Sequence, residues 1–420
     1  MRVACLIVFA VAGAARAGGY AVPNTNARDL SMVGSLIAAQ KDAAATYVNP
    51  AAMAGLEGLS IVADASLIDF KSAWTSPQGA SIGHTDGLLK GAFPPSLFAT
   101  YGGRSGEIGW GVGAGFNIPF GGNVYWPGDW EGRQQVITVN RRVYAWYLNG
   151  GVQPIEQVKV GAGVIYYRTT EELSQAPNFV AQEGSVALGT AGGKLAWQAS
   201  VELTPLRDVP LTIGFDYKHK ADQVLTGTAN FENVPPPLAP NALDQGATHD
   251  LTIPNTFNVG AAYRALPDLL ITGAWTLDRF IVYKQDLFLG DRGTTVIVNH
   301  DFHNGYTFRL GAEYTDVVPR LTVRAGVLRD IAPSRPDTFH PAIPDSDLWA
   351  GAIGLGYRFK PELEVNATYF HAFFDSMTTT PTAAFPGTYN TRANIATVGL
   401  VWHMGPTPKG SSAALYRPSK

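Results

Sequence analysis

An apolar–polar alternation with a period of two recurs along most of this chain and limits what it can fold into. In LWAGAIGLGYRFK (348–360), Ile353 and Leu355 fall on one face and Gly354 falls on the other. Successive side chains point to opposite faces of a β-strand, so the segment predicts a strand with one apolar face and one small or polar face. The same pattern returns at 211–220 and 321–327.

The first residues read as a secretory signal peptide. Arg2 supplies the positive charge, Val3–Ala15 the apolar stretch and Ala15-Arg16-Ala17 a small-residue cleavage site, which predicts a mature start at Gly18. The only cysteine, Cys5, lies in this segment. We therefore expect no disulfide framework in the mature chain, and no redox site.

Composition narrows the class of protein further. Charged residues make up 15% of the chain, and without Arg2 and Arg16 there are 29 basic residues against 34 acidic ones, a net charge of −5. This balance offers no basic surface for nucleic acid. After the signal peptide no apolar run reaches the roughly 20 residues of a transmembrane helix. An exported chain of aromatic-rich alternating strands predicts a bacterial outer-membrane β-barrel. A soluble β-sandwich would alternate too, but here aromatic residues recur near strand ends, where a membrane interface would hold them.

The alternation predicts an all-β fold, a 14-stranded antiparallel transmembrane barrel. Short connections such as 104–107 and 360–362 would be periplasmic turns, and long ones such as 232–251 and 333–347 would be extracellular loops. The expected strands lie near 60–74, 95–103, 108–121, 134–153, 158–173, 194–205, 210–231, 252–265, 269–289, 302–316, 321–332, 348–360, 363–379 and 391–404.

The domain organisation follows from these strands. We expect a signal peptide at 1–17, an N-terminal hatch in the lumen at 18–59 with a short helix over Ala38–Tyr47, the barrel at 60–404, and a flexible periplasmic tail at 405–420. A barrel of this strand number encloses more space than a side-chain-filled one of about eight strands, so a plug is expected.

Three motifs, in order along the chain, resemble those of the FadL-type family of outer-membrane transporters for long-chain fatty acids and aromatic hydrocarbons. They are Asn49-Pro50-Ala51, NIPFGGNVYWPGDWEGR (117–133) and IPDSDLWAGAIGLGYRF (343–359). The resemblance implies a hatch that carries the first motif, and a third strand that bends inward and opens the barrel wall. Solute would then leave sideways into the outer membrane.

The opening implied by this resemblance falls on a proline inside an expected strand. Pro119 removes a ladder donor, and flanking glycines let the backbone bend. The bland alternative is that the strand simply ends there. The residues expected to form the kink and lateral opening are Asn117, Ile118, Pro119, Phe120 and Gly121.

The ligand-binding pattern departs from the family. The motif of aromatic-Lys-Asp-x-Tyr type corresponds here to Phe302-His303-Asn304-Gly305-Tyr306. A neutral histidine pairs weakly with a carboxylate, which favours a neutral solute over a fatty acid. Arg168 could still supply a cation, or could point to solvent or pair with Glu171 or Glu172. Phe179, with Val180, Val186 and Leu188, could form an external apolar groove or only pack its own loop. The candidate ligand-binding residues are Arg168, His303, Tyr306 and Phe179.

Other classes of function have little support in the sequence. His300 and His303 would fall on opposite faces of a strand, so we expect no metal site, and no other motif indicates a cofactor. No Gly-x-Ser-x-Gly elbow marks a hydrolase, so we expect no enzyme. We expect a monomeric passive channel whose partners are a hydrophobic small molecule, outer-membrane lipid and lipopolysaccharide. A structural or adhesive barrel and a polar diffusion porin remain as alternatives, and the natural solute stays open.

Overall fold

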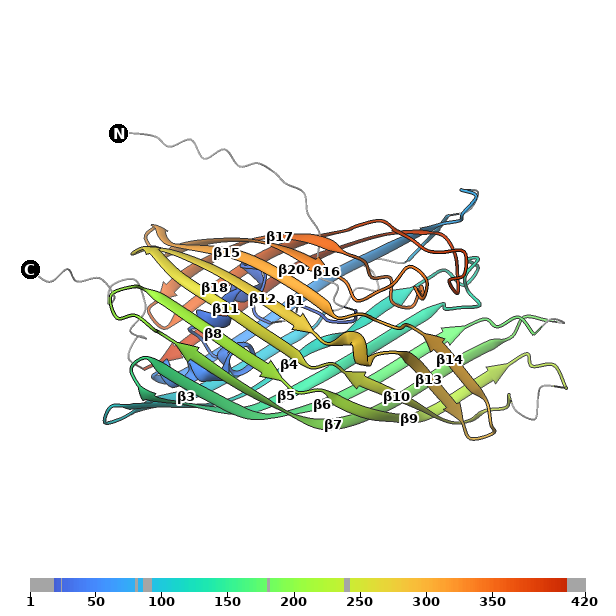
Figure 1. Cartoon of the computed structure of the whole chain (residues 1–420), viewed down its shortest axis with the longest axis horizontal. Helices are drawn as coiled ribbons and strands as arrows, with labels where there is room; N and C mark the ends of the chain where they lie inside the picture. The colour runs from blue at the N-terminus through green and yellow to red at the C-terminus, as the bar shows by residue number, and fades with distance from the viewer. Residues whose placement is uncertain are drawn as a thin grey trace, which may run out of the picture.

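The computed structural model describes residues 19–405, except 24, 80–81, 86–92, 180–181 and 238–241. The expected signal peptide, Gly18, Val180 and most of the expected tail lie outside the described residues. Figure 1 shows tilted strands around one closed barrel, with the N-terminal helices inside it. No helix in the described part of the chain is both long and apolar enough to cross a bilayer.

Fourteen antiparallel wall strands form the barrel, which confirms the predicted fold. Each pairs with its neighbours along the chain, and β1 pairs with β20 from Leu59↔Met404 to Thr75↔Thr388, which closes the wall. The wall strands are β1 (Gly58–Thr75), β3 (Pro95–Ser105), β4 (Ile108–Tyr125), β5 (Thr138–Ile155), β6 (Val158–Gln175), β7 (Ser185–Leu203), β8 (Leu211–Lys218) continued by β9 (Ala221–Glu232), β10 (Gln245–Ile253) continued by β11 (Thr256–Leu266), β12 (Leu269–Asp278), β15 (Gly305–Val318), β16 (Leu321–Ile331), β17 (Leu348–Lys360), β18 (Leu363–Phe374) and β20 (Thr388–Met404).

Short strands extend this wall. The expected single strand at 269–289 is wrong in detail, because it is interrupted by the 3₁₀ turn η4 (Phe280–Val282). Beyond η4, β13 (Gln285–Gly290) pairs with β10 and forms a hairpin with β14 (Thr295–Asn299). β2 (Ile82–His84) pairs with β1, and β19 (Met377–Thr378) pairs with β20.

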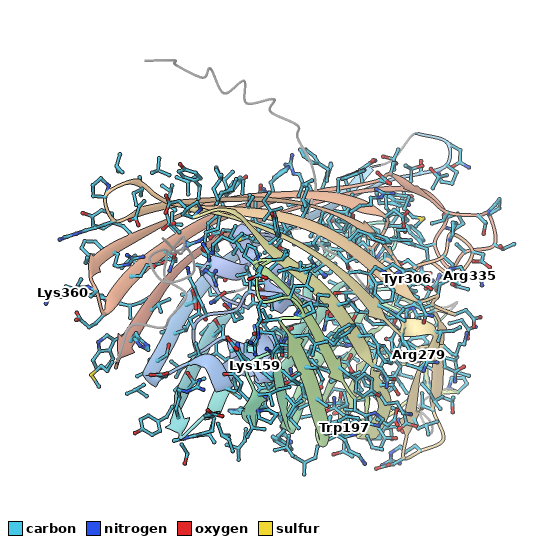
Figure 2. All side chains as sticks on the ribbon, turned by 60° about the vertical axis from the view of Figure 1, so that its left-hand side comes forward. Lys159, Trp197, Arg279, Tyr306, Arg335 and Lys360 are labelled. Atoms are coloured by element: carbon cyan, nitrogen blue, oxygen red, sulfur yellow. The ribbon has the colours of Figure 1, made fainter. Side chains whose placement is uncertain are left out.

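The outer and inner faces of the wall differ as the alternation requires. On β5, the outward side chains of Trp146 and Leu148 are 42% and 64% exposed. The next residue, Asn149, points into the lumen and is buried. Contact with lipid favours apolar side chains on the outer face, and hydrogen bonding favours polar side chains on the inner face. Figure 2 shows Lys360, beside the tight β17–β18 turn, at one end of the barrel and Arg335 at the other. The end with short turns is the periplasmic end.

The hatch consists of four short helical segments in the lumen. These are α1 (Ala27–Ser31), η1 (Leu36–Ala38), α2 (Ala45–Val48) and η2 (Pro50–Gly55). The helix expected over Ala38–Tyr47 is therefore wrong, since α2 begins only at Ala45. In the turn before α2, Asp42 Oδ1 accepts a hydrogen bond from the Ala44 N–H at 2.9 Å.

Glycines on the inner face of the wall make room for the hatch. A Cβ at Gly111 of β4 would lie 2.4 Å from the Met53 carbonyl oxygen, and one at Gly161 of β6 would lie 2.3 Å from the Ala51 nitrogen. The backbone of η2 therefore touches the backbone of the wall. In GVGAG (111–115), Gly111 and Gly113 thus make room for the hatch, whereas Gly115 makes room for the Phe98 side chain of β3.

Candidate functional site

The wall is irregular where β4 carries its proline. Asn117 pairs with Ala145 of β5 and Phe120 pairs with Val143, so β4 has one more residue than β5 between these pairs. Such an extra residue is a β-bulge, which bends the strand. On its other edge β4 pairs with β3 only as far as Phe116, opposite Leu97. Among the described residues, the part of β4 beyond Phe116 is therefore no longer paired with β3.

The N-terminal segment of the described chain pairs with the edge of β4 that β3 no longer covers. Ala21 forms an antiparallel bridge with Phe120. The Val22 N–H donates to the Pro119 carbonyl at 2.8 Å, and the Gly121 N–H donates to the Tyr20 carbonyl at 2.7 Å. We call Tyr20–Pro23 the gate segment. It acts as a short extra strand on the kinked part of β4.

An aromatic and charged cluster holds the gate segment from the lumen side. The buried Tyr20 ring lies 5.4 Å from the Phe280 ring and 5.8 Å from the Phe120 ring, and its hydroxyl donates to the Thr252 carbonyl at 2.6 Å. The Arg141 guanidinium lies 5.3 Å from the centre of the same ring. These contacts fix the segment through its first side chain.

Two carboxylates neutralise Arg141. Its Nη2 lies 2.6 Å from Glu171 and 3.5 Å from Asp286. The buried His249 imidazole bridges the same carboxylates, with Nδ1 2.7 Å from Glu171 and Nε2 2.9 Å from Asp286. Arg141 is therefore committed to a buried network, which leaves it poorly placed to bind a ligand carboxylate.

A cavity of about 460 Å³, here the wall cavity, lies beside the kink. Its lining mixes the two faces of the barrel. Ile68 of β1 and Ile395 of β20 face inward, whereas Arg142 and Tyr144 of β5 belong to the outward set that continues with Trp146. The cavity therefore lies at the kink with residues of both faces of the wall around it. Ile118, Gly121, Phe93 and the gate residues complete much of the lining.

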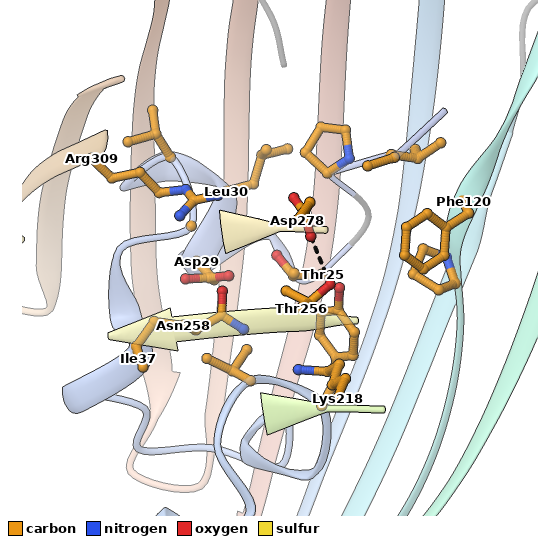
Figure 3. Close-up of a pocket in the computed structure, with 18 of the residues that line it drawn as sticks. Thr25, Asp29, Leu30, Ile37, Phe120, Lys218, Thr256, Asn258, Asp278 and Arg309 are labelled. Carbon is orange, nitrogen blue, oxygen red and sulfur yellow. Dashed lines mark hydrogen bonds between the residues drawn. The ribbon is translucent and has the colours of Figure 1, made fainter. Parts of the chain in front are cut away.

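A smaller cavity of about 60 Å³, here the lumen pocket, lies on the other side of the gate segment. Figure 3 shows Asp29 and Ile37 of the hatch facing Lys218, Asn258 and Arg309 of the wall across it. Both cavities share Ala21, Val22 and Pro23 in their linings. The gate segment is thus the partition between the two cavities.

Arg309 is the most unusual charge of the lumen pocket. It is only 5% exposed, and its Nη1 donates to the Thr276 hydroxyl, but its Nε and Nη2 find no hydrogen-bond partner among the described residues. The Lys218 ammonium, in contrast, lies 2.5 Å from Asp216 and 4.6 Å from the centre of the Tyr47 ring. The free guanidinium donors give the pocket one polar end.

The Asn49-Pro50-Ala51 motif seats the hatch. The Asn49 side chain is fully buried, donates to the Ile37 carbonyl at 2.7 Å and accepts from the Ala51 N–H at 3.2 Å. The same N–H also lies 2.8 Å from the Ser200 hydroxyl of β7. Asn49 thus joins two hatch turns at the point where they touch the wall.

We expect Asn49→Ala to loosen the hatch without loosening the barrel. Loss of the cap costs about 1 kcal/mol, which corresponds to about fivefold faster local opening. Amide hydrogen exchange should rise over 36–51, while the heat-induced unfolding of the barrel stays at the wild-type temperature. Asn230→Ala, at an exposed position on β9, is the control. Unchanged exchange over 36–51 would show that the motif carries no local stability.

A three-cation cluster fixes the other side of the hatch. The Glu313 carboxylate of β15 is 1% exposed and lies 2.8 Å from Arg28 Nε and 3.0 Å from Lys41 Nζ, both in the hatch. Arg324 of β16 holds the same carboxylate at 2.7 Å. Breaking one partner of such a buried cluster leaves uncompensated charge, so the cluster ties hatch and wall into one unit.

The three sequence motifs meet around the gate segment and the hatch. The first seats η2, the second forms the kink, and the third contains Asp345, whose Oδ2 accepts from the Gly19 N–H at 3.1 Å. Burial, and next the charge of Asp330, hold the pKa of the Asp345 carboxyl well above its usual range. Asp345 also lines the wall cavity.

The predicted kink residues lie together at this site. Ile118 and Gly121 line the wall cavity, Pro119 and Phe120 line the lumen pocket, and the buried Asn117 amide oxygen accepts from the Tyr147 hydroxyl at 2.9 Å. They therefore stand at the boundary between the two cavities.

The predicted ligand-binding residues are not brought together, and none of the four lines either cavity. Arg168 is exposed on the outer face of β6, and His303 is exposed, with Nε2 3.5 Å from Arg335. Tyr306 stacks on Trp275 at 6.5 Å, and Phe179 packs near Gly184 in its own turn. Figure 2 shows Tyr306 and Arg335 toward the same end of the barrel.

Sequence reasoning missed two parts of the site. Arg309 and Glu313 share the inner face of β15 with Thr307, and the alternation of TFRLGAEY (307–314) could have placed both in the lumen. The gate segment gave no comparable signal, because its partner lies about a hundred residues further along the chain.

A closed β-barrel with a hatch in its lumen and a cavity beside a kink in its wall defines an outer-membrane channel of the hatched type. The chain belongs to the outer membrane protein transport protein family (OMPP1/FadL/TodX), whose model matches residues 8–402. It is a protein of the outer membrane. No curated protein matches the chain in sequence.

Solved structures share this fold. A FadL homologue from Pseudomonas aeruginosa aligns with a TM-score of 0.79 and 20% identity, covering 92% of this chain and 99% of that one. The P. putida toluene transporter TodX gives a TM-score of 0.75 and 14% identity, covering 93% and 100%. The Ralstonia pickettii toluene transporter TbuX gives 0.68 and 14%, covering 90% and 98%.

Proposed function

We propose that this chain is a passive channel for hydrophobic compounds, which enter the lumen from outside and leave sideways through the wall cavity into the outer membrane. The observation that carries the proposal is the lining of that cavity, which joins inward-facing Ile68 and Ile395 to outward-facing Tyr144. Its volume of about 460 Å³ lies within the range of small-molecule sites, about 300–1,000 Å³. Each buried CH₂ favours lipid over water by about 0.8 kcal/mol, so a sideways path suits an apolar solute.

In this proposal, passage of solute depends on movement of the gate segment. Ala21–Pro23 separate the lumen pocket from the wall cavity, so passage requires this segment to leave β4. On the β4 side it is held by two backbone hydrogen bonds, which together form the Ala21–Phe120 bridge. Each such bond contributes only about 0.5–1.5 kcal/mol, so the contact can open reversibly.

The charges favour a neutral solute, such as an aromatic hydrocarbon, over a long-chain fatty acid. Arg141, the inward-facing cation that lines the wall cavity, is already held by Glu171 and Asp286. Arg309 remains a possible partner for a carboxylate in the lumen pocket, and a fatty acid is the second candidate. The printed names of TodX and TbuX, toluene transporters, agree with the first choice.

The chain works as a monomer and not as an enzyme in this proposal. The β1–β20 ladder closes the barrel, so the edges that these two strands turn to each other offer no free place for a second copy. The apolar outer face contacts membrane lipid and lipopolysaccharide.

Uptake in cells that express the chain, compared with cells that lack it, tests the proposal. We expect faster uptake of toluene than of a long-chain fatty acid, and no swelling of protein-containing liposomes in sugar solutions. Sugar-driven swelling would show a polar porin instead. No uptake of either solute, with confirmed surface expression, would leave a structural or adhesive barrel.

A further inference from the structure

Four basic side chains stand on the outer face of the wall on either side of the wall cavity. Arg142 and Arg168 lie on β5 and β6, and Lys71 and Arg392 lie on β1 and β20. We call these four residues the rim cluster. We propose that the rim cluster binds the phosphate groups of lipopolysaccharide in the outer leaflet, so that the lateral opening is framed by this lipid.

The strand registers bring these residues into two pairs. Lys71 and Arg392 are direct partners across the β1–β20 ladder. Arg168 is the partner of Tyr144, which lies two positions along β5 from Arg142, so the two arginines are diagonal neighbours. Diagonal neighbours on one face of a sheet are within reach of long side chains. Each side of the opening therefore presents two cations that one phosphate group could join.

The height of the rim cluster matches lipid headgroups. On the periplasmic side of Arg142, β5 continues with outward Tyr144 and Trp146, and on β6 the outward residue before Arg168 is Tyr166. Arg392 is the ladder partner of Phe373 of β18. Aromatic rings mark the interface of a membrane, so cations level with them or just beyond them on the extracellular side lie among the headgroups.

The charges of the rim cluster are only weakly compensated. No ion pair within 4.0 Å joins Arg142, Arg168 or Arg392 to an acidic residue in the described part of the chain, and Lys71 lies 3.7 Å from Asp69. The outward carboxylate nearest along β6, Glu172, accepts from the Asn140 amide at 2.9 Å. Like charges placed as neighbours repel, and an external anion would relieve that repulsion.

Phosphate is the anion that fits both position and chemistry. The planar, permanently charged guanidinium binds phosphate oxygens through two parallel N–H bonds. In the outer leaflet of an outer membrane, phosphate groups at this height belong mainly to lipopolysaccharide. The inference does not depend on which solute is transported, because the rim cluster belongs to the outer face of the barrel, where Arg142 also lines the wall cavity.

Binding of purified lipopolysaccharide to the full-length chain in neutral detergent tests the inference. We expect Arg142→Gln/Arg168→Gln to weaken binding about thirtyfold, about fivefold for each charge removed. Arg142→Lys/Arg168→Lys should retain most of it. The matched control is Arg207→Gln, which removes one charge from a side chain that is 75% exposed at the periplasmic end and should bind like the wild type. Wild-type resistance to heat on gels confirms that each variant has assembled.

The lipid probes separate the sources of phosphate. Enzymatic removal of the phosphates from the lipopolysaccharide should weaken wild-type binding and leave the glutamine variant unaffected. Equal binding of intact and dephosphorylated lipid would overturn the inference, as would wild-type affinity in the glutamine variant. Binding of phosphatidylglycerol bicelles as tight as that of lipopolysaccharide would show a general lipid-phosphate site and overturn the assignment to lipopolysaccharide.

Discussion

A chain with a regular β4 should assemble normally and lose at least about nine-tenths of its hydrophobic uptake. The bulge consists of one residue, because β4 advances from Asn117 to Phe120 while β5 advances only from Ala145 to Val143. Replacing Asn117–Phe120 by the three residues Thr-Val-Thr removes that residue and returns the missing N–H donor. The restored ladder stabilises a straight strand by about 0.5–1.5 kcal/mol for each added bond. A straight β4 no longer bends away from β3, so the wall cavity should close.

The control for this variant is Pro119→Ala. It returns the same donor but keeps the extra residue, so the register shift and most of the uptake should remain. Uptake must be measured in cells with equal surface expression, because a misassembled barrel would also fail to transport. If the straight variant imports toluene at the normal rate, the solute does not leave through the wall and must pass the hatch into the periplasm.

The strand pattern could be predicted because lipid and lumen impose opposite demands on alternate residues. The pattern gave wrong strand limits where the strands extend beyond the membrane. β7 begins at Ser185 and not near 194, because Ser-Val-Ala-Leu-Gly-Thr-Ala-Gly-Gly (185–193) extends beyond the lipid and shows little contrast between its faces. The break between β12 and β13 has the same origin, since β13 belongs to an extracellular hairpin that no membrane constrains.

The candidate site was predicted in part. Pro119 marked the kink, because proline inside an alternating run removes a ladder donor whatever the surrounding fold. The role of Tyr20–Val22 could not be read in the same way, since three residues carry no period and their pairing with β4 depends on the closed barrel. His303 is the opposite case, because the motif and the geometry point to different places. A motif position suggested a ligand contact, but the structure places this side chain at the exposed end of the barrel, beside Arg335.

A disulfide between the gate segment and β4 should stop uptake, and a reductant should restore it. Ala21 and Phe120 form an antiparallel bridge flanked by the hydrogen bonds of their neighbours, which is the arrangement of a non-hydrogen-bonded pair. Such pairs hold their Cα atoms about 4.5 Å apart, within the range that a disulfide spans. The natural chain has only one cysteine, Cys5, inside the expected signal peptide, so Ala21→Cys/Phe120→Cys would carry the only thiols of the mature protein.

The lock tests movement of the gate segment and nothing else. When oxidised, the double variant should take up toluene at the rate of cells without the channel, and after reduction it should match Phe120→Cys alone, which reports the cost of losing the buried ring. Ser66→Cys/Thr397→Cys is the matched control, because these side chains face each other across β1 and β20 with their oxygens 2.8 Å apart, and a bond there joins two strands that are already fixed. Oxidation should leave transport by this control unchanged. Normal uptake by the oxidised gate variant would mean that solute reaches the wall cavity without displacing Tyr20–Pro23. The entry path would then have to run from the extracellular loops directly into that cavity.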